Sequence, residues 1–107
     1  MNTIIKTGAE EILVRYEDPQ DGLHGTHCWD EDLGYVITVH HRQGSHAAAM
    51  TLLHEVLHNI DDRYGLDLEE QGVATLEQAL ADLIDRNPVI MTTLVETLAS
   101  RPPTQEP

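Results

Sequence analysis

Aromatic residues and cysteine are scarce in this chain of 107 residues, which has no phenylalanine, one tryptophan and one cysteine. Since 40% of the residues are hydrophobic, aliphatic side chains have to supply the core. The lone Cys28 excludes an intrachain disulfide, as is usual in the reducing cytoplasm. No run approaches the roughly 20 apolar residues of a membrane span, and the N-terminal MNTIIKTGAE lacks the apolar stretch of a secretory signal. We therefore expect a cytoplasmic protein without a membrane partner.

Basic residues are also few. Six lysines and arginines stand against nineteen aspartates and glutamates, which gives a net charge of −13. Phosphate backbones and anionic membrane surfaces repel such a chain, so we expect no direct contact with nucleic acid. The acidic balance is compatible with a cationic partner or a divalent metal ion.

Alternating and β-branched residues predict a small sheet in the N-terminal part of the chain. In one predicted strand, Ile12, Val14 and Tyr16 alternate with charged or exposed neighbours. The stretch 22–34 looks irregular. Strands are predicted at 3–6, 10–16 and 35–39. We expect a sheet of about three strands of the antiparallel type.

The remainder of the chain is typical of helices. Ser45 can cap the first helix, Gly65 can end it, and Asn87-Pro88 separates the last two. Helices are predicted at 46–64, 68–86 and 88–100, and the tail 101–107 is expected to be disordered. The predicted fold class is therefore α+β, with residues 1–100 as a single domain.

The stretch LLHEVLHNID, residues 52–61, combines an amphipathic helix with a histidine pair. His54 and His58 are four residues apart, so they lie one above the other on one helix face. Two such imidazoles can bind one zinc ion, and Glu55 beside them can reach a water on that metal. The apolar stripe predicted to face the core is Leu53, Val56, Leu57, Ile60 and Tyr64. We interpret this HExxH pattern as a candidate metal site.

A catalytic zinc usually needs a third protein ligand. Asp62 lies about 12 Å from His54 along a straight helix, so the two cannot share an ion. Asp61 is better interpreted as a hydrogen-bond acceptor that orients an imidazole. Glu70 and Glu77 lie on an otherwise apolar seam of the next helix, where an unpartnered carboxylate is costly. Helical rise places Glu77 at the level of the metal if the two helices pair evenly.

The run TLLHEVLHNIDDRYGLDLEEQGVATLEQALADLIDRNP, residues 51–88, resembles a family of small phage-encoded metallopeptidases, related in style to the minimal zincins of the ImmA/IrrE type. The matching positions are Thr51 to Glu55, His58, Ile60, Asp61, Gly65, Leu66, Glu70, Val73, Asn87 and Pro88. The resemblance implies a zincin-like hydrolase with Zn²⁺ as cofactor and a protein or peptide substrate. For a phage protein, the compartment would be the host cytoplasm.

By position, the resemblance assigns zinc ligation to His54, His58 and Glu70. It assigns the activation of water to Glu55. It also implies that an extended substrate pairs with the strand 35–39 beside the active helix. Glu70 is the third ligand by resemblance, whereas Glu77 is favoured by helical rise, and both stay open. Asp67 followed by Glu70 is also a capping-box pattern, which would explain Glu70 without any metal.

Other histidines and other functions are open as well. His24, His27 and Cys28 have a spacing that a second metal could use, and a surface loop would explain them equally simply. His40 and His41, after the third strand, either line the cleft or face solvent. One alternative function is a zinc-binding regulatory or interaction protein without turnover. Another is an acidic interaction protein whose histidines are incidental.

Overall fold

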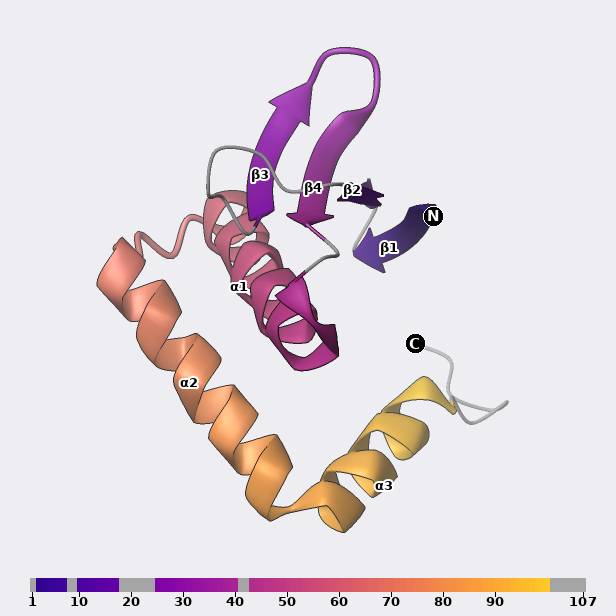
Figure 1. The fold of residues 1–107 in the computed structure, drawn as a ribbon, viewed down its shortest axis with the longest axis vertical. Coiled ribbons are helices and arrows are strands. Elements are labelled where there is room, and N and C mark those ends of the chain that lie inside the picture. Colours follow the sequence, from indigo (N-terminus) through magenta and orange to yellow (C-terminus); the bar gives the residue numbers. More distant parts are fainter. Residues whose placement is uncertain (1, 8–9, 18–24, 41–42, 101–107) are drawn as a thin grey trace, which may run out of the picture. The chain divides into compact units, whose positions relative to one another are not determined.

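The structure is a computed structural model that describes residues 2–7, 10–17, 25–40 and 43–100 (Figure 1). These residues form an α+β fold, as the sequence predicts. The strands are β1 (Asn2–Thr7), β2 (Glu10–Glu17), β3 (Gly25–Asp30) and β4 (Gly34–His40). The helices are α1 (Ser45–Tyr64), α2 (Glu70–Arg86) and α3 (Pro88–Ala99). The tail 101–107 lies outside the described residues.

The sheet is mixed, with the strand order β1-β2-β4-β3. β1 pairs with β2 and β3 pairs with β4 in the antiparallel sense, whereas β2 and β4 are parallel. The predicted sheet of about three strands of the antiparallel type is therefore confirmed for two of the described pairings, whereas the β2–β4 pairing is parallel and the additional strand β3 was not predicted. β3 precedes β4 in the sequence, and the β3–β4 hairpin reverses the direction of the chain. As a result, β4 runs alongside β2 in the same direction.

β3 lies in the stretch 22–34, which was predicted to be irregular. Its residues GTHCWD carry little β-branched character, so the local pattern gives a weak strand signal. The strand is held by its register with β4, from Gly25 opposite Val39 to Asp30 opposite Gly34. The Asp30 carboxylate accepts the backbone N–H groups of Asp32 and Leu33 at 2.8 and 3.0 Å, which closes the hairpin.

The core lies between the sheet and α1, which packs against β3 and β4 (Figure 1). Alternation along β2 and β4 directs one set of aliphatic side chains to this face, as predicted for Ile12 and Val14. The apolar stripe predicted for α1 is wrong at its last residue, since Tyr64 is 60% exposed. The packed residues are Ile12, Val14, Ile37 and Val39 from the sheet with Ala48, Leu52 and Val56 from α1.

The segment between α1 and α2 sets the geometry of the candidate site. α1 ends at Gly65 as predicted, in the left-handed conformation (φ 61°, ψ 40°) that glycine adopts without strain. At the other end of α1, Gly44 takes the cap position without a side-chain hydrogen bond, so the cap predicted for Ser45 is wrong. α2 begins at Glu70 itself, so Asp67 is not the residue that directly precedes the helix, and the helix start does not support the capping-box alternative for Glu70.

The chain divides into two compact units, Met1–Glu77 and Gln78–Pro107. The first contains the sheet, α1 and the start of α2. In the second, apolar side chains of α3 are largely exposed, including Val89 and Leu98. Across the described ranges, no helix combines the length and the apolar character that a bilayer crossing requires.

Candidate metal centre

Two histidines of α1 converge on one point. His54 and His58 are separated by one helical turn, and their ring centroids lie 4.7 Å apart. The two Nε2 atoms are 3.1 Å apart. The side chains are 24% and 27% exposed, so both rings sit at the edge of the packed region. Solvent therefore has access to the point where the two nitrogens meet.

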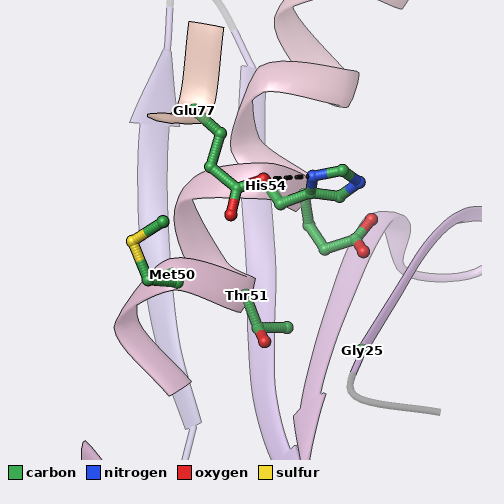
Figure 2. A pocket seen from close by; sticks show the side chains of 6 residues that line it. Gly25, Met50, Thr51, His54 and Glu77 are labelled. Atoms are coloured by element: carbon green, nitrogen blue, oxygen red, sulfur yellow. Dashed lines mark hydrogen bonds and ion pairs between the residues drawn. The ribbon is translucent and has the colours of Figure 1, made fainter. Parts of the chain in front are cut away.

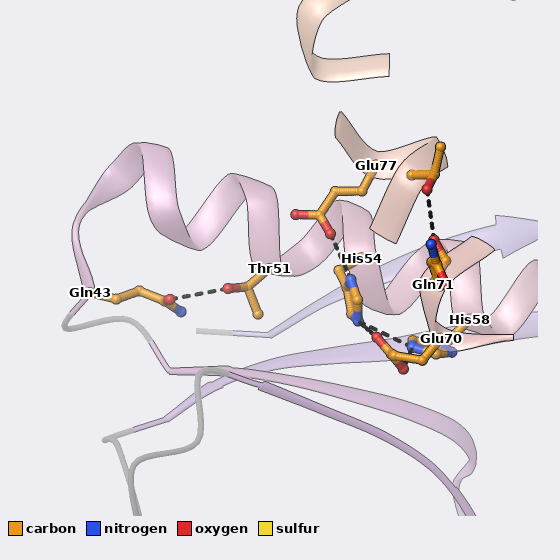
Figure 3. A network of polar contacts seen from close by, with 8 residues as sticks. Gln43, Thr51, His54, His58, Glu70, Gln71 and Glu77 are labelled. Carbon is orange, nitrogen blue, oxygen red and sulfur yellow. Dashed lines mark hydrogen bonds and ion pairs between the residues drawn. The ribbon is translucent and has the colours of Figure 1, made fainter. Parts of the chain in front are cut away.

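Glu70, the first residue of α2, closes this arrangement (Figure 3). Its Oε1 lies 2.8 Å from His54 Nε2, and its Oε2 lies 2.9 Å from His58 Nε2. The turn before α2 directs Glu70 to this place, since the Asp61 carboxylate accepts the backbone N–H of Leu68 at 2.9 Å. One acid and two imidazoles thus meet from two different helices.

The three side chains approach the spacing of ligands around a tetrahedral zinc ion. Ligand atoms about 2.1 Å from a tetrahedral zinc lie about 3.4 Å from one another. The two Nε2 atoms are 3.1 Å apart, and they lie 2.8 and 2.9 Å from different oxygens of Glu70, so all three separations are somewhat shorter than that value. Within the described part of the chain, these are the side chains grouped closely enough to hold a metal, with ligand atoms within 4.8 Å of one another. Two imidazoles and one carboxylate are a donor set typical of zinc.

Glu77, two turns further along α2, reaches the opposite side of the same imidazole. Its Oε1 lies 2.6 Å from His54 Nδ1, and its side chain is 13% exposed. His54 is therefore held between two acids of α2, Glu70 at Nε2 and Glu77 at Nδ1 (Figure 3).

These acids set the electrostatics of His54. Burial lowers its pKa and is the largest single effect. The hydrogen bond to Glu77 and the charges of the neighbouring glutamates together outweigh burial, so the pKa lies above the usual 6.5. A proton therefore competes with a metal ion for the nitrogen atoms of this ring.

Glu55 follows His54 in α1 and is 9% exposed. Burial raises its pKa above 4.5, and the nearby histidines offset part of this effect. The residue lines a cavity of about 280 Å³ together with Gly25, Met50, Thr51, His54 and Glu77 (Figure 2). A carboxylate in this position borders the space that a ligand of the candidate centre would enter.

Gly25, the first residue of β3, forms the opposite wall of the cavity. A Cβ on this residue would lie 2.5 Å from Thr51 Cγ2 and 2.8 Å from the carbonyl oxygen of Thr38. Glycine therefore allows β3 to approach α1 closely, next to Glu55. Nothing in the local sequence distinguishes this glycine from a turn glycine, so its role could not be predicted from the sequence.

The other candidate residues fall in different places. Asp61 contacts the turn through Leu68, and its predicted contact with an imidazole stays a prediction. His40 is 5% exposed, so the solvent-facing alternative for this histidine is wrong. Cys28 is exposed. His24, His41 and the side chain of His27 lie outside the described residues.

The strand 35–39 cannot pair with a substrate. It belongs to β4, whose two edges are already paired with β2 and β3. In the described sheet the outer strand next to α1 is β3, which has β4 as its neighbour on one side.

Comparison of the chain with protein-family models, with curated protein sequences and with solved structures found no match. The geometry of the residues themselves therefore carries the functional argument.

Proposed function

We propose that this protein is a zinc-dependent peptidase whose metal is held by His54, His58 and Glu70. The observation that carries the proposal is the convergence of two Nε2 atoms and one carboxylate within 2.8–3.1 Å. When bound, zinc would polarise a carbonyl and lower the pKa of a water molecule to about 7. The resemblance to small zincins supports the same assignment, and a phage origin stays a prediction.

Glu55 would act as the general base. Its side chain lines the cavity beside His54, and burial raises its pKa above 4.5, which makes the carboxylate a stronger base. In peptide hydrolysis it would take a proton from the attacking water and deliver that proton to the leaving amine.

β3 would provide the substrate edge in place of β4. An extended peptide can add to the outer edge of a sheet through backbone hydrogen bonds. β3 begins at Gly25, which lines the cavity with Glu55. A peptide paired along β3 would thus pass the acid and the metal ligands.

A zinc-binding protein without turnover is the second candidate. The cavity of about 280 Å³ is at the small end for a ligand site, and this favours a protein that binds metal without holding a substrate. Glu55 distinguishes the two functions, because it is required for turnover and contributes no metal ligand.

The test begins with metal content. Purified protein should bind one zinc per chain by elemental analysis, and His54→Ala should abolish this binding. Against a mixed peptide library, Glu55→Gln should lose about 100-fold or more of any hydrolysis while it keeps the zinc. Glu69→Gln, which removes an exposed acid next to Glu70, is the matched control and should behave as wild type. A wild-type protein that binds no zinc would refute the proposal.

A further inference from the structure

The His54–Glu77 contact bears on which nitrogen of the imidazole is available to a metal. A neutral imidazole has one N–H group and one nitrogen lone pair. An ionised carboxylate accepts hydrogen bonds and has no proton to donate. Both ring nitrogens face a carboxylate, since Glu77 Oε1 lies 2.6 Å from Nδ1 and Glu70 Oε1 lies 2.8 Å from Nε2. Glu77 is the closer acid and is 13% exposed against 67% for Glu70, so water screens its hydrogen bond less and the proton of the neutral ring belongs on Nδ1. The lone pair is then on Nε2, the atom that faces Glu70 and His58.

We infer that Glu77 is a positioning residue, which fixes His54 in the tautomer and ring orientation that present Nε2 to the metal. Its functional meaning rests on the proposed zinc site, but the tautomer itself requires no metal. Glu77 is thus assigned to orienting a ligand and not to binding the ion.

The burial of the two acids supports different roles. The Glu77 side chain is 13% exposed, whereas that of Glu70 is 67% exposed. A carboxylate as buried as Glu77 is costly unless it is hydrogen-bonded, and it forms a hydrogen bond with His54 Nδ1. Without Glu77 the imidazole ring could rotate and present Nδ1 to the metal in place of Nε2. Loss of such an orienting acid typically weakens metal binding by about 10–100-fold.

The first experiment measures zinc affinity by competition with a chelator. Glu77→Ala should weaken binding by about 10–100-fold. Glu77→Gln should retain most of the affinity, because its amide oxygen can still accept the Nδ1–H hydrogen bond. Glu69→Ala removes the same charge from an exposed position and should leave the affinity unchanged. If Glu77→Ala does not fold, Glu77→Met replaces it, since methionine keeps the volume but is a weak acceptor.

The second experiment reads the tautomer directly by long-range ¹H–¹⁵N NMR of the metal-free protein, at a pH where His54 is neutral. The wild type should carry its proton on Nδ1, and Glu77→Ala should show a mixture of tautomers. A proton on Nε2 in the wild type would overturn the inference. Wild-type zinc affinity in Glu77→Ala would also overturn it, although the zinc site would stand. Failure of the wild type to bind zinc would instead refute the proposed function, and the tautomer would still decide the role of Glu77.

Discussion

Replacing Gly25 with alanine tests how closely β3 approaches α1 beside the candidate centre. The added Cβ would lie 2.5 Å from Thr51 Cγ2 and 2.8 Å from the Thr38 carbonyl oxygen. Overpacking of this kind costs about 1–3 kcal/mol. Alanine also restricts the unfolded chain, which offsets up to about 1 kcal/mol of that cost. We expect a net loss of about 1–2 kcal/mol, and a domain of this size loses roughly 4–8 °C in Tm for each kcal/mol.

Urea unfolding followed by circular dichroism measures this loss. Gly72→Ala is the matched control, because a Cβ at Gly72 would meet the Leu68 side chain at an ordinary 3.5 Å. Gly72 lies within α2, where alanine should stabilise the protein by about 0.5–1 kcal/mol. The two substitutions should therefore shift the midpoint in opposite directions.

A second substitution separates the two contacts of the added methyl. Thr51→Ser removes Cγ2 but keeps the hydroxyl that donates to Gln43 at 3.0 Å. In the Gly25→Ala background it should recover part of the lost stability, since the contact with the Thr38 carbonyl is unchanged. If Gly25→Ala is as stable as the wild type, the close approach of β3 to α1 is refuted, along with the cavity wall that it forms.

Three further predictions concern the acids and the metal. In the metal-free protein, Glu55→Gln should be more stable than the wild type at neutral pH. The pKa of Glu55 is raised above 4.5 on folding, so the stability that its protonated form provides is present below pH 4.5 and is lost as the pH rises through the raised pKa. Urea titrations at several pH values should show the advantage of the glutamine variant disappearing below pH 4.5; an advantage independent of pH would contradict this. Zinc at 100 times its Kd should stabilise the wild type by about 2.7 kcal/mol in thermal unfolding and should leave His54→Ala unchanged. Asp61→Ala should lose about 1 kcal/mol in urea unfolding because Leu68 loses its hydrogen-bond acceptor, whereas Asp61→Asn should keep most of the stability.

The helices could be predicted because their signals are local. Periodicity, Gly65 and Asn87-Pro88 each act within a few residues, and the predicted helix bounds differ from the observed ones by at most two residues. The sheet was less accessible because its pairing is long-range. The strand β3 has a weak pattern of its own and exists through its register with β4. The parallel pairing of β2 with β4 depends on that same missed strand.

The candidate site shows the same division between local and long-range information. The HExxH spacing placed His54 and His58 on one face because four residues make about one turn, and this needs no knowledge of the fold. The third acid depended on how the next helix approaches. Helical rise pointed to Glu77 and the family resemblance pointed to Glu70, and both acids contact His54. Rise along an axis specifies the level of a side chain but not which ring nitrogen it meets. Glu70 and Glu77 are therefore competing candidates only if every acid near the histidine has to be a metal ligand. An imidazole has two nitrogens, and a metal site that needs one of them oriented can use a second acid at the other.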